Sequence, residues 1–152
     1  MDQDFNLIRS GVRSGRFPTL GQGAGRRVYD MGDGYVVKVA RNSFGLRQNR
    51  MEYQLSLQYQ GDLLAKVAAV SDRYRLLVMQ AAQPLHDLQP VLDYFHLAKR
   101  SDLAAVPELV VLSRKHHLAM KEFLVSRNWG LINNRPVIID YGFVRQHRRG
   151  LF

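Results

Sequence analysis

Cysteine is absent from all 152 residues, so disulfide bonds and thiolate metal sites are excluded and a reducing compartment is the expected environment. No apolar run approaches the roughly 20 residues that a membrane-spanning helix needs. The acidic opening, Met1 to Phe5, lacks the apolar centre of a signal peptide. We therefore expect a soluble intracellular protein with no membrane partner.

Acidic residues are also scarce, with 13 Asp and Glu against 22 Lys and Arg, which gives a formal net charge of +9. This balance favours acidic partners such as nucleotides, nucleic acid or an acidic protein surface, with a merely solvated basic surface as the alternative. The arginines gather in three groups, which are Arg9, Arg13 and Arg16, then Arg41, Arg47 and Arg50, then Arg145, Arg148 and Arg149.

The residue patterns divide the chain into a β-rich first half and a helical second half. After an approach segment with at most a short helix (1–19), β-branched residues beside the turn signal Gly32-Asp33-Gly34 predict a hairpin over 20–40. A helix over 44–59 and strands over 63–70 and 74–80 follow, then helices over 85–99 and 107–120 and strands over 131–132 and 136–139. We expect an α+β fold, with a small β-rich lobe containing one helix (20–83) and a minimal helical lobe (84–152).

Three closely spaced glycines lie at the start of the predicted hairpin. Gly21, Gly23 and Gly25 would let backbone N–H groups approach phosphate oxygens without obstruction by side chains. A dinucleotide-binding fold needs such glycines to open a helix after a strand, and a Walker P-loop needs Gly-Lys followed by Ser or Thr. Neither pattern is present here, which leaves a phosphate-binding hairpin loop or a plain glycine-rich surface turn.

Lys38 lies in a predicted strand between the apolar residues Val37 and Val39. We expect its ammonium group to point into a cleft and to need an anionic partner, because an unpaired buried charge costs several kcal/mol. Glu52, on the following helix, is the natural candidate. The alternative is a lysine at a sheet edge and a solvated glutamate.

Asn128 and Asp140 are candidate magnesium ligands. The run Val137-Ile138-Ile139 predicts a buried strand that ends at Asp140. Mg²⁺ prefers oxygen ligands and retains water, so one carboxylate, one amide oxygen and the phosphates of a nucleotide suffice. A structural turn aspartate is the alternative for Asp140.

The order of these segments resembles the protein-kinase-like superfamily, especially the small kinase-like proteins of bacteria and their phages. In those proteins a glycine loop, a strand lysine, a helix with Gln-Asn and then Glu, Asn-Trp-Gly and Asp-Tyr-Gly follow one another. Here the counterparts are Gly21 to Gly25, Lys38, Gln48-Asn49 to Glu52, Asn128 to Gly130, and Asp140 to Gly142. The resemblance covers about 20–143 and implies a truncated protein-kinase-like fold. It also implies a cytoplasmic protein of a bacterial or phage-infected cell, with delivery into another cell as the alternative.

The resemblance implies a role for each matching residue in binding ATP and Mg²⁺ in a cleft between the lobes. Lys38 would hold the α- and β-phosphates and Glu52 would orient it, while Asn128 and Asp140 would carry magnesium. Lys38 and Asp140 would be the catalytic residues of a phosphoryl transfer. Val28 and Val36 would face the adenine, and backbone groups of Met79 to Ala82 would hydrogen-bond it. The expected nucleotide site is thus Gly21, Gly23, Gly25, Val28, Val36, Lys38, Glu52, Met79 and Ala81.

Three departures from the family pattern bear on activity. Phe123 stands where the catalytic-base aspartate belongs, and phenylalanine cannot accept a proton. Glu122 is adjacent, but neighbouring side chains on an extended segment face opposite ways. Arg26 replaces the third glycine of the usual loop. The sequence after Gly142 is also too short for an activation segment and a peptide-binding platform, so we expect exposed core in the second lobe for a partner to cover.

Three functions remain open from the sequence. The first is an ATP–Mg²⁺-binding, kinase-like protein, either an atypical phosphotransferase or a pseudokinase. The second is a non-catalytic interaction module on a degenerate kinase fold that binds a dedicated acidic or hydrophobic protein partner. The third is a nucleic-acid-binding protein, which rests on the charge of +9 alone.

Overall fold

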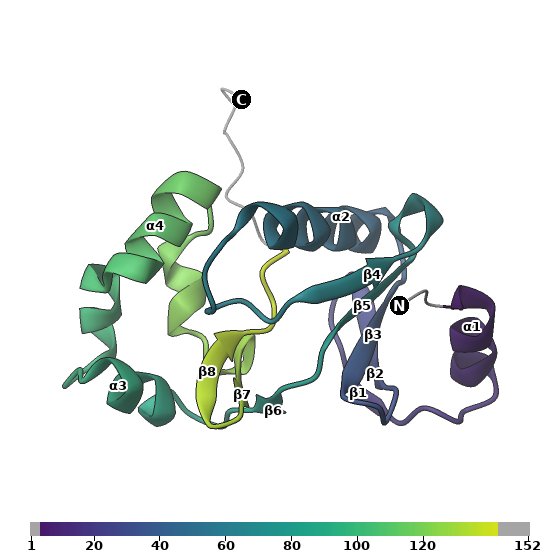
Figure 1. The fold of residues 1–152 in the computed structure, drawn as a ribbon, viewed down its shortest axis with the longest axis horizontal. Coiled ribbons are helices and arrows are strands. Elements are labelled where there is room, and N and C mark those ends of the chain that lie inside the picture. Colours follow the sequence, from purple (N-terminus) through teal and green to yellow (C-terminus); the bar gives the residue numbers. More distant parts are fainter. Residues whose placement is uncertain (1–3, 143–152) are drawn as a thin grey trace. The chain divides into compact units, whose positions relative to one another are not determined.

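The structure is a computed structural model that describes residues 4–142 (Figure 1). The predicted arginine group of Arg145, Arg148 and Arg149 lies outside the described residues. The chain divides into two compact units. The first comprises Met1–Gln58 and Ala65–Ala81, and the second comprises Tyr59–Leu64 and Ala82–Phe152. Each unit is described below by itself.

The first unit is built on a five-stranded antiparallel sheet. Its strands are β1 (Thr19–Gln22), β2 (Arg26–Asp30), β3 (Tyr35–Ala40), β4 (Val67–Val70) and β5 (Leu76–Gln80), in the order β1-β2-β3-β5-β4. The predicted hairpin over 20–40 is therefore three strands. The glycine loop is itself a turn between β1 and β2, closed by a hydrogen bond of 2.8 Å from the Gly23 N–H to the Arg26 carbonyl.

The register of the strands assigns each side chain to one of two faces of the sheet. Val28 pairs with Lys38, and Val36 pairs with Met79, so these four side chains share one face. Tyr29, Val37 and Val78 share the opposite face.

Helix α1 (Phe5–Arg13) covers the face that carries Val37 and Val78. Asp4 caps the helix by accepting hydrogen bonds from the N–H groups of Asn6 and Leu7, at 3.0 and 3.3 Å. Ile8 packs into a buried cluster with Tyr29, Val37, Leu76 and Val78. The segment 1–19 thus contributes to the core of the first unit. Its sequence predicted only an approach segment with at most a short helix.

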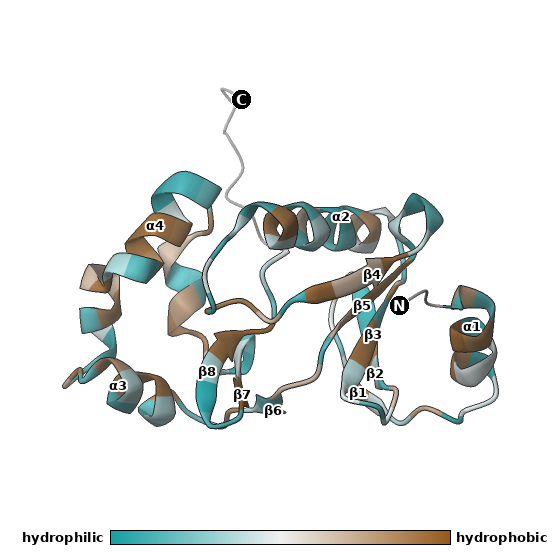
Figure 2. Ribbon diagram, viewed as in Figure 1, coloured by the Kyte–Doolittle hydropathy of each residue, from teal (hydrophilic) through white to brown (hydrophobic). Residues whose placement is uncertain are grey.

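Helix α2 (Ser43–Gln58) contacts β3 and β4, and its residue Glu52 contacts Lys38 on β3. The Asn42 side chain accepts the Gly45 N–H at 3.0 Å and begins the helix. Among Met51, Leu55 and Tyr59, whose four-residue spacing indicates a helix, only Leu55 is buried. The other buried residues of α2 are Gly45, Gln48, Asn49 and Glu52. In Figure 2 the helix is accordingly mainly hydrophilic, because it packs through a polar network described below.

The predicted strand over 63–70 is wrong in its first half. Only Val67–Val70 pairs with β5. Leu63 and Leu64 are buried in the second unit instead, where the Ile138 N–H donates to the Leu63 carbonyl at 2.6 Å. The segment 63–70, which is apolar except for Lys66, therefore contributes to two separate cores, and its residue pattern does not distinguish this from a single strand.

The second unit combines a small sheet with short helices. The strands β6 (Gln83–Pro84), β7 (Trp129–Ile132) and β8 (Arg135–Ile138) lie in that order, and the α-helices are α3 (Gln89–Phe95) and α4 (Pro107–His116). Short 3₁₀ helices span Arg100–Ala105, Met120–Leu124 and Ser126–Asn128, with Asp72–Tyr74 in the first unit. The largest buried side chains here are Phe123, Trp129 and Tyr141.

Both predicted helices of the second half are shorter than expected. Pro90 lies in the first turn of α3, and His96 adopts a left-handed conformation (φ 58°) and ends the helix. His117 (φ 64°) ends α4 in the same way. The α+β class is confirmed. No helix in the described part of the chain is long and apolar enough to cross a membrane.

Candidate functional site

Lys38 and Glu52 form the ion pair that the sequence predicts. The Lys38 Nζ lies 2.9 Å from Glu52 Oε1, and the two residues are 5% and 0% exposed. Lys38 is brought there by strand alternation, which turns it to the face opposite Val37 and Val39. Glu52 is presented one turn after Gln48 and Asn49 on the buried side of α2.

Arg26 joins this pair, which the sequence did not predict. Its guanidinium donates hydrogen bonds to both carboxylate oxygens of Glu52, from Nη1 to Oε1 at 2.7 Å and from Nη2 to Oε2 at 2.9 Å. The residue is 5% exposed. A bidentate arginine–carboxylate pair fixes orientation as well as distance. Glu52 is therefore held by Arg26 on β2 and by Lys38 on β3.

The charges around Glu52 determine its protonation. Burial by itself raises the pKa of this carboxyl, but the charges and hydrogen bonds of Arg26 and Lys38 outweigh burial and lower the pKa from 4.5 to about 2. Glu52 is thus a carboxylate at every physiological pH. The three side chains together carry two positive charges and one negative charge.

Asn49 connects this network to the backbone of the sheet. Its Oδ1 accepts from Arg26 Nη1 at 3.1 Å, and its Nδ2 donates to the Tyr74 carbonyl at 2.8 Å. The Lys38 carbonyl is a further acceptor at 3.4 Å. Asn49 is fully buried, and its side chain anchors α2 to β3 and to the turn before β5.

The three predicted phosphate-loop glycines have different surroundings. A methyl group added at Gly21 or Gly23 would meet nothing within 4 Å, so both positions adjoin open space. A methyl group at Gly25 would collide with the Gln48 side-chain oxygen and would lie 2.9 Å from the Gly45 nitrogen. Gly21 and Gly23 fit an approach to phosphate, whereas Gly25 allows α2 to pack against the loop.

The residues expected around the adenine lie on one face of the sheet with Lys38. Val28 is half-buried, and Val36 and Met79 are buried. The Ala81 N–H donates to the Gly34 carbonyl at 2.9 Å, so this expected adenine donor is used within the first unit.

In the second unit, Asn128 is held by Glu122. Asn128 Nδ2 donates to the Glu122 backbone carbonyl at 3.0 Å and to its carboxylate Oε2 at 3.1 Å. These bonds fix the amide so that Oδ1 is the atom that would meet a cation. The Asn128 carbonyl accepts the Ile139 N–H at 2.8 Å, which places the residue beside the segment that leads to Asp140.

Asp140 is half-buried and lines a small cavity together with Glu122, Phe123 and Tyr141. Glu122 lies on the short 3₁₀ helix Met120–Leu124, not on the extended segment that the sequence suggests. Glu122 therefore shares the cavity with Asp140, and the alternation argument against it is wrong. The Asp140 carboxylate and the Asn128 amide oxygen are donors of the kind that Mg²⁺ prefers, although residues 4–142 contain no cluster of three or more His, Cys, Asp or Glu side chains that could hold a metal.

Phe123 belongs to the core of the second unit. It is 1% exposed, and its carbonyl accepts the Trp129 Nε1–H at 3.0 Å. The position that the resemblance assigns to the base therefore holds a packing residue.

Sequence reasoning missed Arg26, Asn49 and Glu122 as parts of these networks. For Arg26 a signal existed, because a strand that places Val28 beside Lys38 places Arg26 on the same face. For Glu122 no signal existed, because its orientation depends on a short 3₁₀ helix that the sequence pattern does not mark.

No protein-family model matches this sequence, and no curated protein matches it. Solved structures do resemble it. The streptomycin–ATP–APH(2")-IIa ternary complex has a TM-score of 0.49 at 15% identity, over 93% of this chain and 71% of that chain. A mutant form of the Mycobacterium tuberculosis PknI kinase domain has a TM-score of 0.47 at 18% identity, over 82% of this chain and 57% of that chain. At these values the likeness is one of general fold, and nothing about activity or substrate follows from it.

Proposed function

We propose that the protein binds ATP with Mg²⁺ as a kinase-like protein. The observation that carries this proposal is the buried Lys38–Glu52 pair, at 2.9 Å, on the sheet face that also bears Val28 and Val36. A lysine fixed by a carboxylate is suited to hold phosphates, because its position is set before the ligand arrives. The apolar side chains beside it suit a purine ring.

The glycine loop and the second unit each hold further candidate groups for this function. Gly21 and Gly23 leave room for phosphate oxygens, and Asp140 with the Oδ1 of Asn128 would hold the metal. The bound Mg²⁺ would neutralise charge on the β- and γ-phosphates. Glu122 keeps the Asn128 amide in the orientation that presents oxygen to the cation.

Catalysis is a separate step in this proposal. Phosphoryl transfer depends mainly on positioning and electrostatic stabilisation, which Lys38 and Asp140 would provide. Phe123 contributes no base, and Glu122 is the carboxylate closest in the sequence to that position. The protein would therefore be a weak, atypical phosphotransferase acting on itself or on one dedicated partner, or a pseudokinase.

A non-catalytic interaction module is the second candidate function. The observation that favours it is the burial of Phe123, because the position that the resemblance assigns to the catalytic base then holds a core residue that cannot accept a proton. In this case the Lys38–Glu52 network serves stability, and binding of a partner is independent of nucleotide.

Calorimetric titration of ATP with and without Mg²⁺ distinguishes these functions. We expect magnesium-dependent binding that weakens by more than about tenfold in Asp140→Ala and in Lys38→Met. Lys38→Met should remain folded, because Arg26 still holds both oxygens of Glu52.

The matched controls are Asp93→Ala and Lys66→Met, which make the same chemical changes at exposed positions and should bind ATP as the unmodified protein does. If the unmodified protein shows no binding at millimolar ATP, the proposed nucleotide function is wrong and the interaction module remains.

A further inference from the structure

An arginine-rich groove lies in the first unit, at the end of the sheet where β3 leaves and β5 begins. Its volume is about 450 Å³, and it is lined by α1, the end of β3, the start of α2 and the start of β5. Four of its lining residues are Arg9, Arg13, Arg41 and Arg75. The fold thus brings together arginines from three separate parts of the sequence.

The positive charge of this groove is not balanced by carboxylates within it. Among the described residues that line it, none is acidic, and Asp72 lies in a neighbouring hollow that Arg9 also borders. Two of the arginines donate hydrogen bonds to uncharged oxygens. Arg9 donates to the side-chain oxygen of Asn6 at 3.3 Å, and Arg41 donates to the Gly23 carbonyl at 2.9 Å. The other two arginines of the groove are exposed. Four cations that converge in this way make the groove a strong attractor for an anionic ligand.

The start of α2 adds to the same field. Asn42 and Ser43 line the groove, and Ser43 is the first residue of this 16-residue helix. The N-terminal end of a helix carries partial positive charge, which favours acidic groups placed beside it. With the arginines, it gives the groove two independent sources of attraction for carboxylates or phosphates.

The uncharged part of the lining indicates what kind of anion fits. Val12, Val39 and Leu46 are half-buried there, and none of the described lining side chains is aromatic. Single-stranded nucleic acid is held largely by stacking of bases on aromatic rings, which this groove does not offer. Aliphatic side chains between arginines instead match a peptide that carries both carboxylates and aliphatic residues.

We propose that this groove docks an acidic, amphipathic segment of a partner protein. Glutamate or aspartate side chains of the segment would pair with Arg9, Arg13 and Arg75, and an aliphatic side chain would enter between Val12 and Leu46. The proposal is independent of nucleotide binding, because none of these residues belongs to the Lys38–Glu52 network.

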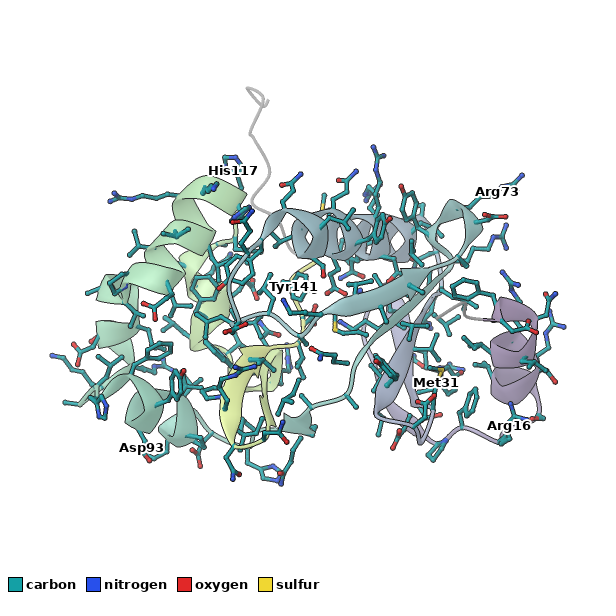
Figure 3. All side chains as sticks on the ribbon, in the orientation of Figure 1. Arg16, Met31, Arg73, Asp93, His117 and Tyr141 are labelled. Carbon is teal, nitrogen blue, oxygen red and sulfur yellow. The ribbon has the colours of Figure 1, made fainter. Side chains whose placement is uncertain are left out.

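The test uses a fluorescent synthetic peptide made of glutamate pairs separated by leucines, followed by anisotropy. The binding variant is Arg13→Gln with Arg75→Gln. The matched control is Arg50→Gln with Arg73→Gln, which removes the same charge from exposed positions of the same unit outside the groove. Arg73 is labelled in Figure 3, where its side chain points outward from the protein.

We expect the binding variant to weaken peptide affinity by about tenfold or more and the control to change it by less than about twofold. A peptide in which alanine replaces the leucines should bind more weakly than the original. Equal losses in both variants would overturn the proposal in favour of general charge attraction. Absence of peptide binding, or single-stranded DNA binding that the Arg13/Arg75 variant alone loses, would also overturn it.

Discussion

Glu52 shows how one buried carboxylate can be stabilised by two cations from different strands. Its pKa is lowered to about 2, so the folded state favours the ionised form more strongly than the unfolded chain does. A lowered pKa of this kind contributes its full stabilisation to the fold at pH values above the ordinary carboxyl pKa of 4.5. That stabilisation, on the order of 3 kcal/mol, is lost progressively as the pH falls from about 4.5 to about 2.

We expect Glu52→Gln to destabilise the protein at pH 7 by roughly 3–5 kcal/mol, because two buried cations lose their carboxylate. The difference from the unmodified protein should shrink as the pH falls from about 4.5 to about 2, because the carboxyl takes up its proton first in the unfolded chain and in the folded protein only near pH 2. Urea denaturation across this pH range measures both effects. Asp72→Asn, at an exposed position, is the control and should show neither. A difference that does not depend on pH would contradict the assignment.

Individual residues also show what the sequence can reveal. Lys38 and Glu52 could be predicted to pair, because a lysine between two valines on a strand needs a partner and the next helix carries a glutamate. Arg26 looks like a mere substitute for a loop glycine, since a motif comparison records its position but not the face of the strand to which it points. Glu122 could not be placed, because a local 3₁₀ turn decides its direction.

At the scale of elements, α2 and the glycine loop depend on each other. Gly25 and Gly45 approach so closely that neither can carry a side chain, and the Asn42 side chain donates to the Ala24 carbonyl at 2.9 Å. The loop that begins the sheet and the helix that carries Glu52 are therefore packed as one piece. The turns at Gly32 to Gly34 and at Asn133 to Asn134 were predictable from composition, whereas this packing was not.

Alanine substitutions at Gly25 and at Gly23 should have different effects on stability. We expect Gly25→Ala to lower the free energy of unfolding by roughly 1–3 kcal/mol, because the added methyl group meets Gln48 and the backbone of α2. Gly23→Ala should leave stability nearly unchanged, since nothing lies within 4 Å. Thermal or denaturant unfolding measures the pair of variants. Equal effects at both positions would contradict the packing role assigned to Gly25.

At the scale of the whole molecule, the dominant property is the net charge of +9. Such a charge attracts any polyanion without a specific site, by release of counterions from the polymer. The arginine-rich groove and this general attraction predict different responses to salt and to mutation.

We expect weak duplex DNA binding whose association constant falls by more than about tenfold between roughly 50 and 200 mM salt. The Arg13/Arg75 and Arg50/Arg73 double variants should reduce it to the same small extent, because each removes two charges. Filter binding or anisotropy over a salt series provides the measurement. Binding that resists salt, or that depends on DNA sequence, would show that nucleic-acid recognition is a specific function of the protein.

Trp129 is the single tryptophan of the chain, fully buried in the second unit with its indole N–H bonded to the Phe123 carbonyl. Intrinsic fluorescence excited at the indole band therefore comes from the second unit alone, and from the residue that directly follows Asn128. An emission change on adding magnesium would be a local optical signal of events at the proposed metal ligands. The five-stranded sheet and α2, by contrast, contain no tryptophan. Their unfolding must therefore be followed by circular dichroism or tyrosine absorbance.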